Sequence, residues 1–261
     1  MKKNLFILAM SLLPMLASAE EVEIDGLWYN LVKKVQSAEV IQYKNNQQYS
    51  GDIVIPDIIK YEEVEYKVKN ISDYAFSRCI NLTSVNIGNN VTSIGRRAFE
   101  NCTSLVSAII GNSVTAIGGS AFSGCKALSS VTIGNSVTIF WNFAFEKCSS
   151  LKTIIIPNSV ERIGAGVFAG CSSLTTVTLG SGLKSVENQS FAYCQELSDV
   201  FCHAVVVPCA LADAFKDSYI EHTTLHVPAV SLADYKAAKP WSEFKNVVTL
   251  SDDNTSISPL E

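Results

Sequence analysis

Apolar positions recur with a fixed period of 23 residues through the middle of the chain. Each period contains a phenylalanine, a cysteine and a leucine at constant spacing, without an insertion. These are Phe76, Phe99, Phe122, Phe145, Phe168 and Phe191; Cys79, Cys102, Cys125, Cys148, Cys171 and Cys194; and Leu82, Leu105, Leu128, Leu151, Leu174 and Leu197. A period of this length indicates that each unit buries its apolar face against its neighbours. The pattern therefore predicts a solenoid of six units over residues 71–202.

Each unit divides into a strand, a turn and a second short strand. The segment LTSVNIG and its copies alternate apolar with small polar residues, which is typical of a strand with one buried face. A Gly-Asn pair, first seen at Gly88 and Asn89, predicts a turn, and VTSIG predicts a second extended piece. Stacked units should place like strands about 4.8 Å apart in parallel ladders.

The motif A-F-x-x-C, which closes each unit, is too short for a long helix. We expect one or two helical turns there that bury the phenylalanine and the cysteine. A disulfide needs Cβ atoms about 3.8 Å apart and turned toward each other, whereas stacked copies point the same way at about the strand spacing. The spacing therefore predicts a ladder of buried free thiols, with occasional disulfides or a redox role as alternatives.

Two segments carry a family resemblance: AFSGCKALSSVTIGNSVTIF at 121–140 and VFAGCSSLTTVTLGSGLKSV at 167–186. They resemble the repeat of the BspA-like leucine-rich repeat family, found on exported proteins of host-associated bacteria and some protists. The resemblance implies a leucine-rich repeat solenoid that serves as a secreted or cell-surface binding module, linked in some members to adhesion to host proteins. It brings no catalytic residue and no cofactor, and it does not identify the ligand.

The two ends of the chain lack the period. Residues 1–19 carry Lys2 and Lys3, an apolar run and an A-x-A site, which predicts a signal peptide cleaved after Ala19. The run is too short for a membrane span, which needs about 20 apolar residues. Residues 20–70 contain strand-like segments and predict an N-terminal β cap. Residues 203–250 predict a C-terminal cap with two short helices, LADAF and SLADYKAA, around a strand TLHVP. The polar tail, 251–261, is expected to be disordered, and the solenoid to close at Cys202.

Charge and motifs argue against several functions. Loss of Lys2 and Lys3 with the signal changes the net charge from −5 to −7, which disfavours nucleic acid as a partner. The sequence has no G-x-S-x-G motif and no histidine within the repeats, so we expect no enzyme and no cofactor.

The C-terminal cap contains all the histidines and two further cysteines. His203, His222 and His226 lie there beside Cys202 and Cys209, but not at a recognised metal-ligand spacing. Free thiols and a bridge between Cys202 and Cys209 both remain open.

The segment IFWNFAF, residues 139–145, has four aromatic rings in seven positions. Aligned to the repeat, Phe145 is the core phenylalanine and Phe140 fills an inward isoleucine position. Trp141 replaces a glycine of three other units, and Phe143 occupies a variable position. We predict that Trp141 and Phe143 form an aromatic anchor for a partner. Its expected neighbours are Ile139, Arg96, Arg97 and Arg162.

A second candidate surface is the outward side of the first strand ladder. Its outward positions are mostly hydroxyl residues, with two isoleucines, and we include Ile109, Thr132, Ile155 and Thr178. The expected partner is a host extracellular-matrix or surface protein, or a glycan. The alternative is a structural component that binds the bacterium's own envelope proteins. The sequence does not predict an oligomeric state.

Overall fold

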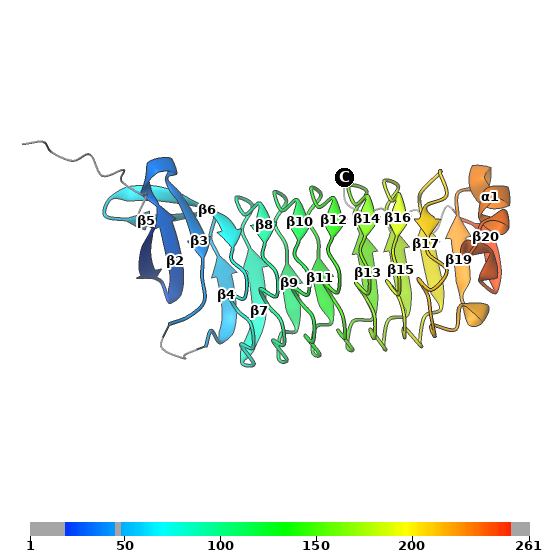
Figure 1. The fold of residues 1–261 in the computed structure, drawn as a ribbon, viewed down its shortest axis with the longest axis horizontal. Helices are drawn as coiled ribbons and strands as arrows, with labels where there is room; N and C mark the ends of the chain where they lie inside the picture. Colours follow the sequence, from blue (N-terminus) through cyan, green and yellow to red (C-terminus); the bar gives the residue numbers. More distant parts are fainter. Residues whose placement is uncertain (1–18, 45–47, 252–261) are drawn as a thin grey trace, which may run out of the picture.

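The computed structural model describes residues 19–44 and 48–251. The predicted signal segment before residue 19 and the tail after residue 251 lie outside the described residues. The chain winds into an elongated solenoid, with the N-terminal strands at one end and short helices at the other (Figure 1). None of the helices among the described residues is long and apolar enough to cross a membrane.

The first strand ladder is parallel throughout and divides into two sheets. A four-stranded sheet contains β4 (Gly51–Ile55), β7 (Leu82–Ile87), β9 (Ser107–Ile109) and β11 (Ser130–Thr132). A five-stranded sheet contains β13 (Thr153–Ile156), β15 (Thr176–Leu179), β17 (Asp199–Cys202), β19 (Thr224–Val227) and β20 (Asn246–Thr249). Since β11 and β13 belong to different sheets, the first ladder is interrupted between these two strands.

The second ladder is continuous. It joins β6 (Val64–Ile71), β8 (Ser93–Ile94), β10 (Ala116–Ile117), β12 (Ile139–Phe140), β14 (Arg162–Ile163), β16 (Ser185–Val186) and β18 (Cys209–Ala210) in parallel. At the N-terminal end the same sheet takes in β1 (Glu20–Ile24), β2 (Leu27–Val32), β3 (Ser37–Val40) and β5 (Ile58–Tyr61), with η1 (Lys33–Val35) between β2 and β3. The antiparallel pairs β1–β2, β2–β3 and β5–β6 lie only at this end of the described chain.

The core between the ladders is a column of nearly parallel phenylalanine rings. Neighbouring ring centroids lie 4.8 Å apart at Phe76 and Phe99, and 5.6 Å apart at Phe145 and Phe168. Each ring packs on the next unit's copy because the 23-residue period returns the side chain to the same angular position. The column continues past the sixth unit, where Phe191 and Phe215 stack at 5.4 Å.

The prediction of helical turns at A-F-x-x-C was wrong. These segments form successive hydrogen-bonded turns, because two positions in each unit have positive φ and end any helical run. One series is Tyr74, Arg97, Ser120, Phe143, Gly166 and Gln189; the other is Arg78, Asn101, Gly124, Lys147, Gly170 and Tyr193. The segment LADAF also forms turns, so its predicted helix is wrong. In SLADYKAA, α1 (Leu232–Ala237) is confirmed.

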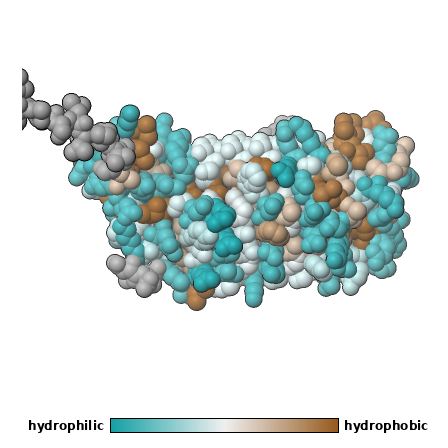
Figure 2. Space-filling view, in the orientation of Figure 1, coloured by the Kyte–Doolittle hydropathy of each residue, from teal (hydrophilic) through white to brown (hydrophobic). Residues whose placement is uncertain are grey.

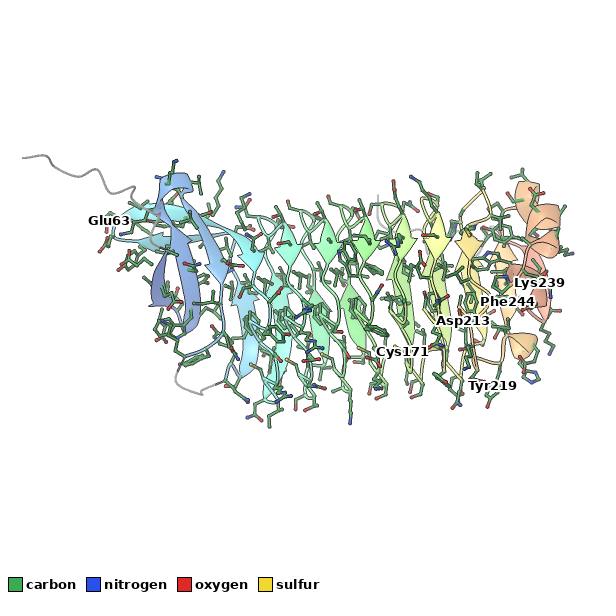
Figure 3. The ribbon with its side chains drawn as sticks, viewed as in Figure 1. Glu63, Cys171, Asp213, Tyr219, Lys239 and Phe244 are labelled. Atoms are coloured by element: carbon green, nitrogen blue, oxygen red, sulfur yellow. The ribbon has the colours of Figure 1, made fainter. Side chains whose placement is uncertain are left out.

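The sequence predicts that the solenoid closes at Cys202, but the strand ladders continue beyond this residue. Here β18 pairs in parallel with β16, and β19 with β17, so the segment predicted as a cap adds further turns to the stack. The end is covered by η2 (Ile220–His222), η3 (Ala229–Ser231), α1 and η4 (Trp241–Glu243). Trp241 and Tyr235 are fully buried there. Figure 3 labels Lys239 and Phe244 at this end of the solenoid.

Candidate functional site

The cysteine ladder belongs to the core. All six repeat cysteines are buried free thiols, as predicted, and Cys171 lies within the body of the solenoid in Figure 3. From Cys102 onward each thiol donates to the carbonyl oxygen of a phenylalanine 26 residues earlier, at 3.0 Å for Cys102 and Phe76. Burial raises the pKa of the Cys148 and Cys171 thiols well above its ordinary value. Protonated, inaccessible thiols are poor nucleophiles and poor metal ligands.

The aromatic segment 139–145 divides between core and surface. Phe140 and Phe145 are fully buried, while Trp141 is 47% and Phe143 is 43% exposed. The repeat therefore accounts for two of the four rings, and the other two, separated by one residue, are partly exposed to solvent.

Glycines set the surroundings of Trp141. In the preceding unit, Gly118 occupies the repeat position of Trp141. It fits so closely that an added Cβ would lie 2.6 Å from the backbone of Gly95. Gly119 has more space, because an added Cβ would meet only Asn142 O at 3.4 Å, Arg96 Cγ at 3.9 Å and Trp141 Cβ at 4.0 Å. Arg96 Cγ and Trp141 Cβ thus both lie next to a position that carries no side chain.

Phe143 packs over Gly166. Both residues have positive φ, +63° for Phe143 and +61° for Gly166, and a Cβ on Gly166 would lie 2.5 Å from two carbons of the Phe143 ring. The ring therefore rests on the bare backbone of the next unit. A side chain at residue 166 would displace it.

The predicted arginine neighbours occupy three different environments. Arg96 donates from Nη2 to the hydroxyl of Tyr74 at 3.0 Å, and Arg97 lies against Glu100, with Nε 3.5 Å from Oε1. Arg162 Nε is 3.2 Å from Glu187 Oε1, and Arg162 pairs with Ile139 in the second ladder. Arg162 therefore lies in register with Ile139, while the guanidinium groups of Arg96 and Arg97 both lie over the Tyr74 ring, 5.8 Å from its centroid.

The outward strip of the first ladder is only partly exposed. Ile109 and Ile155 are exposed, as is Thr132. Thr178 is only 2% exposed, so its prediction as an accessible residue was wrong. Its short side chain lies in register between the larger Ile155 and Phe201, which cover it.

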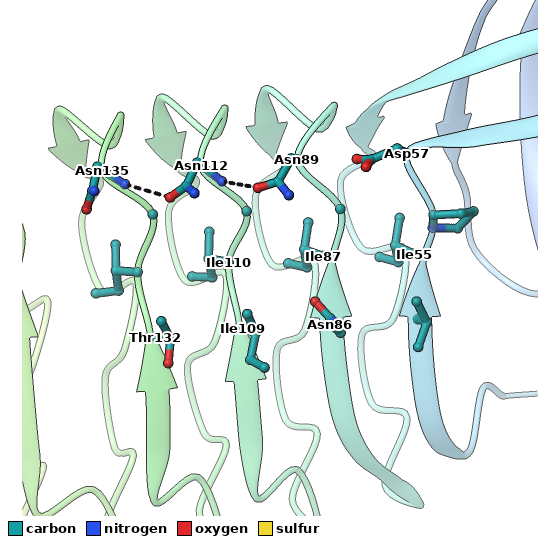
Figure 4. A pocket seen from close by; sticks show the side chains of 16 residues that line it. Ile55, Asp57, Asn86, Ile87, Asn89, Ile109, Ile110, Asn112, Thr132 and Asn135 are labelled. Atoms are coloured by element: carbon teal, nitrogen blue, oxygen red, sulfur yellow. Dashed lines mark hydrogen bonds between the residues drawn. The ribbon is translucent and has the colours of Figure 1, made fainter. Parts of the chain in front are cut away.

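A groove of about 640 Å³, not recognised from the sequence, follows the ends of β4, β7, β9 and β11. It is lined by four equivalent segments, 54–57, 86–89, 109–112 and 132–135, so Ile109 and Thr132 belong to it (Figure 4). The repeated Gly-Asn pair is the sequence feature that could have indicated this groove, but from the sequence it predicted only a turn.

The C-terminal histidines and cysteines do not converge. Cys202 Sγ lies 3.2 Å from the hydroxyl of Tyr235, while Cys209 is exposed, and both are free thiols. His226 Nε2 lies 2.9 Å from Asp199 Oδ1. Within residues 19–44 and 48–251, no three His, Cys, Asp or Glu side chains are grouped closely enough to hold a metal ion.

The surface between the ends is mostly hydrophilic or neutral. In Figure 2 the brown, apolar residues form separate small areas on the visible face instead of one continuous band. Individual exposed apolar residues are normal on soluble proteins, so the question is which of them lie together.

Comparison with known proteins supports the solenoid assignment. A family model for the BspA type leucine rich repeat region matches residues 69–198 in 6 copies. A leucine rich repeat protein of T. pallidum is similar, with 26% identity and a TM-score of 0.61 over 73% of this chain and 89% of that chain. A leucine-rich repeat protein from Bacteroides ovatus shares the fold, with 20% identity and a TM-score of 0.52 over 88% of this chain and 76% of that chain. No curated protein matches the chain.

Proposed function

Because the chain belongs to the BspA type leucine rich repeat family, we propose that it is an exported, non-catalytic module that binds a protein partner at the bacterial surface. Leucine-rich repeat solenoids are rigid scaffolds that offer long regular surfaces to other proteins. The predicted signal peptide supports export, and the absence of catalytic motifs from the sequence supports a binding role.

The exposure of Trp141 and Phe143 is the observation that carries the proposed binding site. Trp and Tyr anchors and arginines dominate the energetics of protein interfaces, especially where large rings can be desolvated in the complex. The Phe143 ring is held against the backbone of Gly166, so little conformational entropy of that side chain is lost on binding. Arg162, in register with Ile139 in the second ladder, adds a cationic side chain to the proposed site.

A host extracellular-matrix or surface protein is the proposed partner. The binding test uses the chain from Glu20 onward, immobilised and exposed to purified matrix proteins, to glycan arrays and to envelope proteins of the same bacterium. Binding to a matrix protein that falls at least about tenfold in Trp141→Ala/Phe143→Ala would support the proposal. Saturable binding only to the bacterium's own envelope proteins would favour the alternative role in envelope assembly.

Matched variants separate the site from general surface effects. Val106 and Tyr193 are about as exposed as the two rings and lie outside the segment 139–145. Val106→Ala and Tyr193→Ala should therefore leave binding unchanged. Export is tested separately: the mature protein recovered from the cell exterior should begin at Glu20, and retention of the full N-terminal segment in the cytoplasm would contradict it.

A further inference from the structure

The groove along β4, β7, β9 and β11 carries a row of fixed hydrogen-bond donors. The backbone N–H of Asn112 donates to Asn89 Oδ1 at 2.9 Å, and the N–H of Asn135 donates to Asn112 Oδ1 at 3.3 Å (Figure 4). Each of these two oxygens is used by the next unit, which fixes the orientation of its carboxamide. The Nδ2 groups of both residues then remain as donors.

These donors have no partner of their own. Among the described residues, no acceptor is bonded to Nδ2 of Asn89, Asn112 or Asn135, and all three side chains are exposed. Successive donors are separated by about the strand spacing of 4.8 Å. They form a short, regular array along one wall of the groove.

The floor beside this array is partly apolar. The outward side chains of the four strands are Val54, Asn86, Ile109 and Thr132, of which Val54 and Ile109 are well exposed. No lysine, arginine or aromatic residue lines the groove, and Asp57 is its one charged residue. Its lining thus combines neutral donors with aliphatic contacts and a single negative charge.

We propose that this groove binds an extended, uncharged or basic peptide segment of a partner protein, lying along the solenoid axis across the repeat units. Carbonyl oxygens of its backbone and side chains accept hydrogen bonds from the asparagine amides, and its apolar side chains pack on Val54 and Ile109. Nucleic acid does not fit a groove without cations. Asp57 disfavours acidic peptides by like-charge repulsion.

The geometry explains why the site ends where it does. The four-stranded sheet ends at β11, which does not pair with β13, and the groove ends at the same unit. Asn158 repeats the asparagine position in the next unit and accepts from the N–H of Ser181 at 2.8 Å, but it lies outside the groove. Asn158 is therefore a natural control for the donors within it.

The experiment pans a random peptide display library against the chain from Glu20 onward, and measures the enriched peptides by fluorescence anisotropy. Asn112→Asp keeps an oxygen for the N–H of Asn135 but removes the amide donor, so peptide binding should weaken at least about tenfold. Asn158→Asp adds the same charge outside the groove and should bind like the wild type. The difference in peptide affinity between the two variants should persist at high salt. An effect of the added charge alone would be screened there.

A second pair of variants tests the apolar floor without threatening the fold. Ile109 and Val106 are each 49% exposed, but only Ile109 lines the groove. Ile109→Ser should weaken peptide binding and Val106→Ser should not. Equal binding by Asn112→Asp and wild type, no enrichment of peptides, or enrichment of acidic peptides would each overturn the proposal. Binding of a glycan on an array that requires the groove residues would also overturn the proposal.

This site is independent of the proposed aromatic anchor. Trp141→Ala/Phe143→Ala should retain full affinity for groove-binding peptides, since neither residue lines the groove. Peptides lost in that double variant and retained in Asn112→Asp would place their binding at the aromatic anchor and contradict the groove.

Discussion

The thiol of Cys148 donates a hydrogen bond to the carbonyl oxygen of Phe122, 3.3 Å away and 26 residues earlier in the chain. The same bond recurs in neighbouring units, for example from Cys171 to Phe145 at 3.3 Å. The same carbonyl oxygen also accepts from the backbone N–H of Cys125 at 3.2 Å, so the thiol adds a second hydrogen bond from the next unit. The cysteine is thus both a small apolar residue and a weak donor, which explains its place in each unit.

We expect the thiols to differ sharply in reactivity. Cys209 is exposed, whereas the other seven cysteines are buried. A thiol reagent should therefore modify one cysteine rapidly in the folded protein and all eight after denaturation. Fast modification of several cysteines under native conditions would contradict the buried ladder. Cys209→Ser is the control and should remove the fast phase.

Stability should fall at alkaline pH. Burial raises the pKa of the Cys194 thiol from its ordinary value of 9.0 to about 12. Above about pH 9 the unfolded chain releases protons that the folded chain retains, so the stability present below this pH is lost as pH rises toward about 12. The urea midpoint should be lower at about pH 10 than at about pH 8. Burial also raises the pKa of Tyr29 and Tyr49, so Cys194→Ala should reduce this dependence without abolishing it.

Phe122→Ala and Trp141→Ala should have opposite effects on stability and binding. The Phe122 ring is fully buried between Phe99 and Phe145, at 4.9 and 5.1 Å. Its removal should cost about 3–5 kcal/mol of unfolding free energy. Trp141→Ala should cost less than about 1 kcal/mol, because nearly half of the side chain is already in water. Urea denaturation followed by circular dichroism compares them, and a large loss in Trp141→Ala would make that ring a core residue.

Gly111→Ala should strongly destabilise the stack. A Cβ at residue 111 would lie 2.4 Å from the carbonyl oxygen of Gly88, so neighbouring units would have to separate. Gly119→Ala is the matched control, since its nearest contact would be an ordinary 3.4 Å. We expect a loss of about 2 kcal/mol or more for Gly111→Ala and little change for Gly119→Ala, measured by urea denaturation. Similar midpoints for both would contradict the close approach of the units.

Gly166→Ala should disturb the aromatic anchor from beneath. Gly166 and Gly170 both have positive φ, so alanine at either costs about 1 kcal/mol of backbone strain. Only at Gly166 would the new methyl group meet the Phe143 ring. Gly166→Ala should therefore weaken binding of any partner that uses Phe143, while Gly170→Ala should lower stability alone. Equal partner affinities in both variants would argue against Phe143 as an anchor.

The sequence by itself determined the repeat and therefore most of the core. A 23-residue period in Phe, Cys and Leu is sufficient to predict stacked units, parallel ladders and free buried thiols, because each unit repeats the same local geometry. It also separated Phe140 and Phe145 from Trp141 and Phe143, since the aligned units show which positions must face inward.

Only the tertiary structure decided what depends on neighbouring units. Positive φ at residues as different as Tyr74, Ser120 and Phe143 replaced the expected helical turns, and no composition rule identifies such positions. Thr178 is buried because its neighbours in register are larger, and the chain beyond Cys202 joins the stack although its spacing changes. The asparagine amides became a donor array only because each unit's backbone fixes the side chain of the unit before it. A period specifies what every unit shares, while contacts between units decide what each surface presents.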